Sequence, residues 1–157
     1  MRKKHVMKSG FSLLEVVIVV AIVAILAAIG IPRMSRGSKG AGDSALKANL
    51  SVLRNAIDLY SAEHQGDYPA VATFSDQLTQ YSDASGNTNA SKTTSYIYGP
   101  YIRSIPVVPV GPNKGKNGVS ADGSDPNDGW VYTAASGTIV ANTGTDKDDA
   151  DVLYSDY

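Results

Sequence analysis

A single carboxylate, Glu15, lies inside an almost entirely apolar run from Phe11 to Ile31. As a helix rising about 1.5 Å per residue, this run is long enough to cross the roughly 30 Å apolar core of a bilayer. A carboxylate in that environment costs on the order of 2.5 to 3.5 kcal/mol on insertion scales. Glu15 is therefore either tolerated near an interface or kept for a purpose.

A second group of side chains that could do chemistry is the aspartates of the C-terminal third. Carboxylates on loops are the hard oxygen ligands that calcium prefers, although their spacing here does not match the EF-hand pattern. Two interpretations stay open: solvated aspartates that form turns, or a calcium site that braces a domain without cysteines. The candidate ligands are Asp122, Asp125, Asp128, Asp146 and Asp148.

Other catalytic and cofactor-binding patterns do not fit. In "GPNKGKNG", Gly111 and Gly115 enclose three residues instead of four, and Asn117 stands where a phosphate loop needs serine or threonine. Glu15 and Glu63, the only glutamates, are too far apart to form a carboxylate pair, and cysteine is absent. We therefore expect a protein that is not an enzyme and that needs no cofactor, calcium excepted.

The charges are distributed unevenly along the chain. Four of its 14 basic side chains lie within residues 1–10, which contain none of the 15 acidic ones. A short basic leader before an apolar helix stays on the cytoplasmic side of a membrane, so the C-terminal part is expected to cross it. The acidic remainder argues against nucleic acid as a partner.

This organisation predicts a leader over 1–10, a hydrophobic helix over 11–32 that spans the membrane, and a globular head over 33–157. Pro32 is expected to kink or loosen the first helix. Asp43 is a candidate N-cap for a renewed amphipathic helix over about 43–65, which Gly66 would end. Its apolar stripe has spacings of three and four and consists of Leu46, Leu50, Leu53, Ile57 and Tyr60.

The second half of the head changes towards the period of a β-sheet. A short helix is expected around Phe74–Tyr81, a polar surface loop over 82–95, and a small antiparallel sheet within about 96–142. Its clearest strands, "GWVYT" and "GTIVAN", would pair, and an acidic tail over 143–157 would follow as loop. The fold class is therefore α+β, with an inner sheet face of Ile97, Ile105, Trp130, Tyr132 and Ile139 packed on the helical stripe.

Three interpretations of the N-terminus compete. The first is a secretory signal peptide cleaved near "LAAIG", although its apolar run exceeds the usual length. The second is a permanent single-span anchor. In the third, cleavage after Gly10 makes Phe11 the new amino terminus, one helical turn from Glu15. The carboxylate of Glu15 would then neutralise the terminal amine of a neighbouring subunit and set the register of an assembly.

The segment "GFSLLEVVIVVAIVAILAAIGIP" resembles the class III signal of type IV pilins and type II secretion pseudopilins. This resemblance implies cleavage between Gly10 and Phe11 by a membrane aspartic peptidase, which also N-methylates Phe11. It further implies that Glu15 guides subunit registration and that Pro32 lies near the end of the assembly helix. Ala24 departs from the family, which often has glycine there.

A second resemblance, to the major pseudopilin of type II secretion, extends into the head. It covers "LYSAEHQGDYP" and "GPYIRSIPVVPVG", but "VPVG" replaces the family's Asp-Pro-Trp-Gly stretch and its calcium-binding loop is not recognisable. The matching residues are Tyr60, Gly66, Tyr68, Pro69, Pro100, Tyr101, Ile105 and Pro106.

Together the resemblances imply a type IV pilin-like structural subunit of a helical filament. The first expectation is a pseudopilin whose homo-oligomer is a periplasmic pseudopilus that supports secretion. The alternative is a pilin of a cell-surface type IV pilus used in adhesion, motility or DNA uptake. Implied partners are the prepilin peptidase and N-methyltransferase, an inner-membrane assembly platform, and minor pilins or pseudopilins. The precursor would be a single-pass protein of the inner membrane with a periplasmic head.

Overall fold

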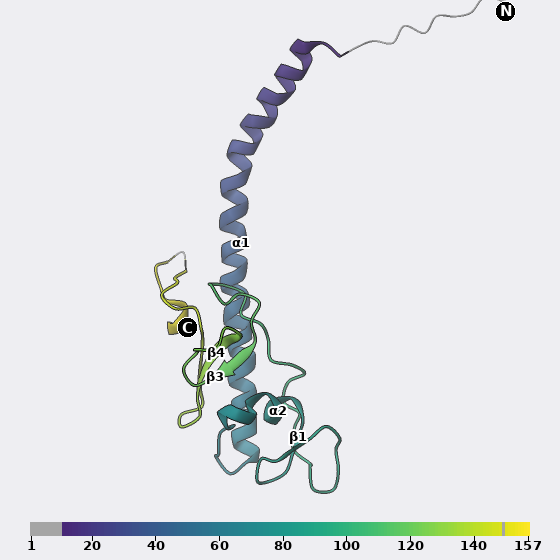
Figure 1. Cartoon of the computed structure of the whole chain (residues 1–157), viewed down its shortest axis with the longest axis vertical. Coiled ribbons are helices and arrows are strands. Elements are labelled where there is room, and N and C mark those ends of the chain that lie inside the picture. Colours follow the sequence, from purple (N-terminus) through teal and green to yellow (C-terminus); the bar gives the residue numbers. More distant parts are fainter. Residues whose placement is uncertain (1–10, 149) are drawn as a thin grey trace, which may run out of the picture. The chain divides into compact units, whose positions relative to one another are not determined.

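The computed structural model describes residues 11–148 and 150–157, without the side chains of residues 30–38. The chain divides into two compact units, residues 1–38 and 39–157 (Figure 1). The leader, including Gly10, lies outside the described residues. The elements in chain order are α1 (Leu13–Glu63), η1 (Val71–Thr73), α2 (Phe74–Thr79), β1 (Tyr81–Ser82), β2 (Thr88–Asn89), β3 (Gly118–Ser120), β4 (Asp128–Thr133), β5 (Thr138–Ala141) and η2 (Tyr154–Asp156).

In the first unit, α1 is covered by aliphatic side chains. All side chains described between residues 11 and 29 are exposed, including the large apolar ones. The sequence predicts a membrane span over 11–32. Within the described part of the chain, no helix combines the length and hydropathy that a span requires.

The predicted restart of the helix at Asp43 is wrong. The helix α1 is continuous from Leu13 to Glu63, and Ser44 Oγ donates to Gly40 O across one turn at 2.9 Å. Asp43 instead accepts a hydrogen bond from the hydroxyl of Tyr154 at 2.6 Å. Gly42 has a packing reason, because a Cβ there would lie 2.8 Å from Val110 Cγ1.

The second half of α1 buries the predicted stripe. Leu46, Leu50, Leu53, Ile57 and Tyr60 all lie in the core of the second unit. The helix ends as expected, because Gln65 and Gly66 take positive φ values and Gly66 N donates to Ser61 O at 2.9 Å. The stripe is therefore the element on which the head is built.

The sheet β3-β4-β5 lies beside this half of α1 (Figure 1). The predicted pairing of the last two strands is confirmed, with Trp130 opposite Ala141 in antiparallel β4 and β5. The prediction of a wholly antiparallel sheet is wrong, because β3 runs parallel to β4. Because β3 is short, the loop over 121–127 can bring the chain back to the end of the sheet at which β3 began, so that β4 runs in the same direction.

Most of the predicted sheet face is confirmed. Ile105, Trp130, Tyr132 and Ile139 are buried with the helical stripe. The prediction that Ile97 belongs to this face is wrong, because its side chain is 49% exposed. Its neighbour Tyr98 instead faces inward, where it pairs with Ser82 and its ring centroid lies 5.1 Å from that of His64. Because successive side chains of an extended segment point to opposite sides, Ile97 is turned outward.

The remaining predictions for the head hold in part. The short helix is present as α2, and the tail is loop except for η2 and an isolated bridge between Lys147 and Leu153. The polar loop over 82–95 contains the pair β1 and β2, and Ser82 at its start is fully buried. Tyr81 and Ser82 pair with Asn89 and Thr88, so the loop is a small hairpin instead of irregular chain.

Candidate functional site

Phe11 and Glu15 lie at the start of α1. Phe11 is 80% exposed and precedes the helix, which Val16 N closes through a 3.2 Å hydrogen bond to Ser12 O. Glu15 lies in the first turn, where the partial positive charge of the helix N-terminus favours a carboxylate. The predicted cleavage partner, Gly10, is outside the described residues, so the geometry of the processing site stays a prediction.

Beyond Glu15 the helix offers an uninterrupted apolar surface. Its exposed large side chains continue from Leu13 to Ile29 on every side of the helix. An isolated helix that is apolar all round requires lipid or other protein segments as its surroundings. Pro32 lies within α1, but its side chain is outside the described residues and its role in assembly stays a prediction.

The aspartates of the loop between β3 and β4 are held by donors of that loop. Asp122 accepts bonds from the backbone and hydroxyl of Ser124, which lower the pKa of its carboxyl. Asp125 accepts from Asn127 N at 2.8 Å. Asp128 is buried and accepts from Ser120 Oγ at 2.5 Å and from Asp125 N at 3.1 Å. This loop is thus closed by its own hydrogen bonds.

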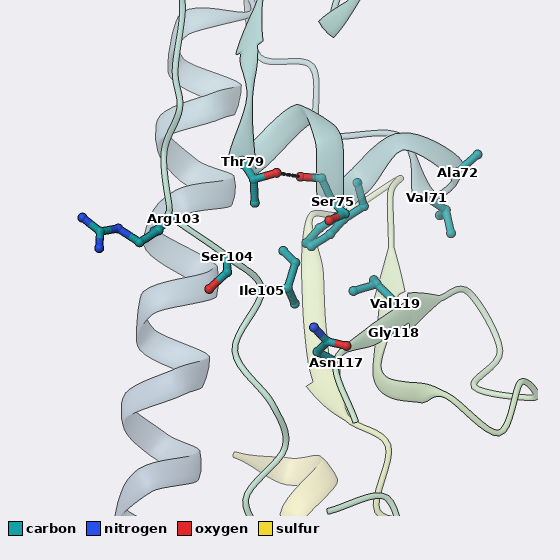
Figure 2. A pocket seen from close by; sticks show the side chains of 11 residues that line it. Val71, Ala72, Ser75, Thr79, Arg103, Ser104, Ile105, Asn117, Gly118 and Val119 are labelled. Carbon is teal, nitrogen blue, oxygen red and sulfur yellow. Dashed lines mark hydrogen bonds between the residues drawn. The ribbon is translucent and has the colours of Figure 1, made fainter. Parts of the chain in front are cut away.

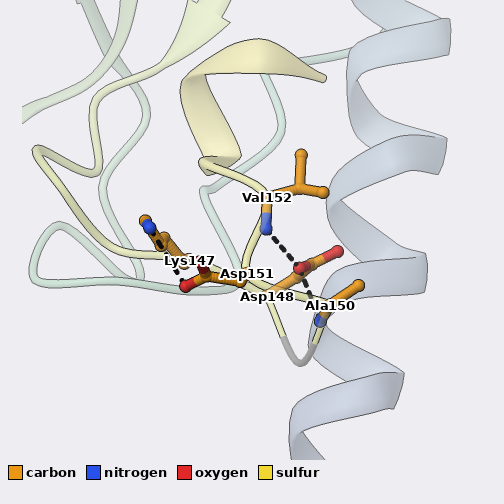
Figure 3. Close-up of polar contacts among 5 residues, drawn as sticks. All are labelled: Lys147, Asp148, Ala150, Asp151 and Val152. Carbon is orange, nitrogen blue, oxygen red and sulfur yellow. Dashed lines mark hydrogen bonds and ion pairs between the residues drawn. The ribbon is translucent and has the colours of Figure 1, made fainter.

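The tail aspartates are used in a similar way. Asp148 Oδ1 accepts from Ala150 N at 2.8 Å and Val152 N at 2.9 Å (Figure 3), and Asp148 Oδ2 accepts from the hydroxyl of Tyr157. These bonds, led by that of Tyr157, lower the pKa of Asp148. Lys147 Nζ lies 3.0 Å from Asp151 Oδ1. Asp146 is exposed.

The structure does not bring the five predicted calcium ligands into one site. Asp122 and Asp125 belong to one loop and Asp128 begins β4, but their carboxylates bond to separate donors. Among the described residues, no three aspartate, glutamate or histidine side chains cluster closely enough to hold a metal ion. The donor set in the loop between β3 and β4 therefore does not fit calcium as it stands.

A set of contacts that the sequence does not predict binds the C-terminal segment to α1. Arg54 donates to Tyr157 O and to Ile139 O, and Lys47 Nζ lies 4.4 Å from the Tyr157 ring centroid. Tyr154 adds its hydroxyl bond to Asp43. No local spacing signals these partners, because more than a hundred residues separate Asp43 from Tyr154.

A second unpredicted feature is a cavity of 410 Å³ between α2, the segment over 103–105 and β3. Its close-up shows the hydroxyl of Thr79 donating to the backbone carbonyl of Ser75, while the Arg103 side chain points away from the cavity (Figure 2). The lining has no histidine, carboxylate or thiol. Its hydroxyls, those of Ser75, Thr79 and Ser104, therefore have no basic side chain of these kinds within the lining to activate them.

Two comparisons with known proteins find similarity to this chain. The family of the prokaryotic N-terminal methylation motif matches residues 7–31. The type II secretion system core protein G of Aeromonas hydrophila is 32% identical over 104 residues, which cover 66% of this chain and 68% of the relative. No solved structure matches the chain significantly.

The match to the Aeromonas protein is longer than the methylation motif by itself, so it includes part of the head as well as α1. The motif covers Phe11, Glu15 and most of the exposed apolar surface. The methylation motif of this chain, combined with this longer similarity, identifies a related subunit. The chain belongs to the family of the type II secretion system core protein G, the major pseudopilins.

Proposed function

We propose that the chain is the pseudopilin subunit of a type II secretion system and that it polymerises into a helical pseudopilus supporting protein secretion. The similarity to core protein G over two thirds of both chains carries this proposal. A type IV pilus pilin, the alternative, is not favoured, since the relative belongs to a secretion system. The role is structural, and we assign no reaction to the protein.

The apolar segment of α1 would be stored in the inner membrane and transferred into the filament. Two observations support this: its side chains are exposed, and it carries the N-terminal methylation motif. Lipid tails are as apolar as leucine, so moving this helix from lipid to protein gains little hydrophobic free energy. Packing and polar contacts must therefore decide the register of the subunits.

Glu15 would provide the polar contact. Cleavage after Gly10 would free the amine of Phe11, and N-methylation would leave its positive charge in place. Two opposite charges 4 Å apart attract by about 4 kcal/mol at an effective dielectric constant of 20, compared with about 1 kcal/mol in water. A Glu15 carboxylate against the Phe11 amine of a neighbour would therefore penalise every other register.

The proposal implies particular partners and a defined route. The precursor would sit in the inner membrane with its basic leader in the cytoplasm and its head in the periplasm. A prepilin peptidase and N-methyltransferase would process it. An inner-membrane assembly platform and minor pseudopilins would then start and extend the filament.

Mass spectrometry of the protein from membranes and from sheared filaments tests this function. We expect a mature chain that begins at N-methylated Phe11. Glu15→Leu should still be inserted and cleaved but should yield few filaments, whereas Glu63→Gln, a change of the other glutamate, should assemble normally. A chain that begins near Gly30, or one that retains Met1 in assembled material, would refute the proposal.

Calcium binding is a separate proposal from the sequence. The loop between β3 and β4 argues against it there, because its carboxylates accept bonds from their own loop. Asp146 is the exposed carboxylate that we propose as the first ligand to test. Calorimetry with millimolar calcium decides the matter: binding that is lost in Asp146→Asn supports the site, and an absence of heat rejects it.

A further inference from the structure

His64 follows the last residue of α1, and only 3% of its side chain is exposed. Its Nδ1 lies 2.9 Å from Tyr60 O, one helical turn earlier, and its Nε2 lies 3.0 Å from Asp83 O, in the loop after β1. The buried Ser82, the second residue of β1, places its hydroxyl oxygen 3.2 Å from Nε2. The ring of His64 therefore binds β1 to the end of α1 (Figure 1).

The two carbonyl oxygens restrict the protonation state of this ring. A carbonyl oxygen only accepts hydrogen bonds, and a neutral imidazole has a single N–H donor. Either neutral tautomer would point a nitrogen lone pair at a carbonyl oxygen, that of Asp83 at 3.0 Å or that of Tyr60 at 2.9 Å. A buried polar atom left without a partner destabilises a fold. An imidazolium ring donates to both oxygens, so the geometry fits the doubly protonated form of His64.

The aromatic rings around His64 also favour a positive charge. The Tyr60 ring is stacked on the imidazole, with centroids 3.8 Å apart and planes inclined by 5°, and the Tyr98 ring centroid lies at 5.1 Å. A cation within about 6 Å of a tyrosine ring is attracted to the face of that ring. Burial, followed by Asp67 and Asp83, raises the pKa of Tyr60, so this phenol carries no charge at neutral pH.

Carboxylates lie near His64 in the described part of the head. Asp83 belongs to the loop, and its pKa lies below the usual range, chiefly because the side chain of a loop asparagine donates to it. Asp67 lines the same 380 Å³ cavity as His64, and no lysine or arginine is among the described residues of that lining. Glu63 accepts a bond from the hydroxyl of Tyr101. These negative neighbours add to the preference for a positively charged ring.

We infer that His64 is a pH-sensitive switch, whose doubly protonated ring holds the loop at residues 82–83 on the end of α1. Loss of one proton at alkaline pH leaves one carbonyl oxygen facing a lone pair, and the loop is released. The released segment is the hairpin of β1 and β2, whose Ser82 also pairs with Tyr98. The switch acts within one head, so it stands or falls independently of the pseudopilus proposed above.

The direction of the pH effect follows from proton binding. Histidine in an unfolded chain loses its proton at about pH 6.5. Above that pH the folded head keeps a proton that the unfolded chain has lost, so folding stability falls as the pH rises. For one proton, the equilibrium constant of unfolding rises by at most about tenfold per pH unit. Tyrosines ordinarily titrate at about pH 10, so the range between about pH 6.5 and 9 isolates the effect of His64.

Nitrogen NMR tests the protonation state directly. The sequence has two histidines, His5 and His64, so the variant His5→Gln leaves one imidazole to observe. For the full chain in detergent at about pH 7.5, one unit above the ordinary titration of histidine, we expect both ring nitrogens to have the similar chemical shifts of an imidazolium. Two widely separated shifts would reveal a neutral ring and would overturn the inference.

Urea unfolding, followed by the fluorescence of the buried Trp130, tests the link to stability. The unfolding constant should rise between about pH 6.5 and 9 in the wild type and in the control His5→Gln, and it should stay flat in His64→Gln. Ser82→Ala should keep the rise, because the two carbonyl oxygens select the charged ring. Loss of the rise in Ser82→Ala, or wild-type stability that increases with pH, would contradict the switch. The NMR measurement uses an unaltered His64, so it decides even if His64→Gln does not fold.

Amide hydrogen exchange identifies the segment that is released. Ser82 N donates to Tyr98 O at 3.0 Å, and the control amide, Asn142 N, donates to Gly129 O at 2.8 Å beside β4. Above the pH at which NMR shows the ring to be neutral, the Ser82 amide should exchange at nearly the rate of an unstructured peptide, and the Asn142 amide should stay protected. Continued protection of Ser82 would refute the switch, and so would loss of protection at both amides, because the whole head would then open together.

Discussion

The hydrogen bond between Tyr154 and Asp43 is predicted to hold the C-terminal segment on α1. Tyr154→Phe removes the hydroxyl but keeps the buried ring, so it isolates the 2.6 Å bond to Asp43 Oδ1. A hydrogen bond to a charged group contributes about 1.5 to 3 kcal/mol, and the partial exposure of Asp43 favours the lower end. At about 4 °C per kcal/mol, the unfolding temperature should fall by about 6 °C.

The assay is urea and thermal unfolding of the full chain in detergent. Trp130 is the only tryptophan and is fully buried, so its fluorescence reports on the core of the head. Asp43→Ala, which removes the acceptor, Tyr154→Phe and the double variant complete a cycle. We expect the second change to cost little once the first has been made, giving a coupling free energy of about 1.5 kcal/mol.

The cycle also distinguishes this contact from the helix N-cap that the sequence predicts. An N-cap aspartate would stabilise α1 whether or not residue 154 has a hydroxyl, so the two changes would be additive. Additivity within about 0.3 kcal/mol would therefore refute the hydrogen-bond argument. A loss of stability in Asp43→Ala that persists in the Tyr154→Phe background would restore the N-cap interpretation.

Three further predictions concern the same core. Gly137→Ala should destabilise the head by about 1 to 3 kcal/mol, because φ is +69° and a Cβ would lie 2.5 Å from the Tyr68 ring. Gly115→Ala is the control and should cost less, because its φ is +87° but the space around it is open. Comparable urea midpoints for the two variants would contradict this prediction. Tyr132→Phe should preserve or raise stability, because its buried hydroxyl has no hydrogen-bond partner among the described residues; a loss above about 1 kcal/mol would reveal a missed partner. Burial raises the pKa of Tyr132 to about 12, so the unfolded chain loses this proton at lower pH than the folded head, and folding stability falls as the pH rises from 10 towards 12. Tyr132→Phe should flatten that part of the stability profile measured by fluorescence. An unchanged profile would assign the alkaline loss of stability to other tyrosines.

Local periodicity was sufficient to predict the helix and strands that supply the core of the head. The stripe from Leu46 to Tyr60 could be read because a helix that packs on one side repeats its apolar residues at three and four. Trp130, Tyr132 and Ile139 followed for the corresponding reason in strands. The burial of these residues in a single core confirms that each amphipathic element found the other.

The failed prediction of an N-cap at Asp43 depended on a partner that is distant in sequence. Asp43 has the side chain of an N-cap, and only the Tyr154 hydroxyl shows that its carboxylate is used otherwise. Gly42 looks like a helix breaker until Val110 is placed against it. The aspartates Asp122 and Asp128 accept bonds from Ser124 and Ser120, and calcium binding by this chain stays a prediction. For Asp43 and Gly42, the sequence shows the residue type, but it does not show which residue contacts it in the fold.

The same limit explains why α1 has two apolar faces with different meanings. The inner stripe is satisfied within one chain, so a structure of one copy accounts for it completely. The apolar side chains over residues 13–29 and, in the head, those of Val52 and Leu59 are exposed in that same structure. Exposing contiguous apolar surface is unfavourable for a protein that works alone, but it suits a subunit whose folding is completed by its neighbours. Apolar side chains that the core does not bury therefore indicate, in the sequence of one subunit, that the subunit assembles with others.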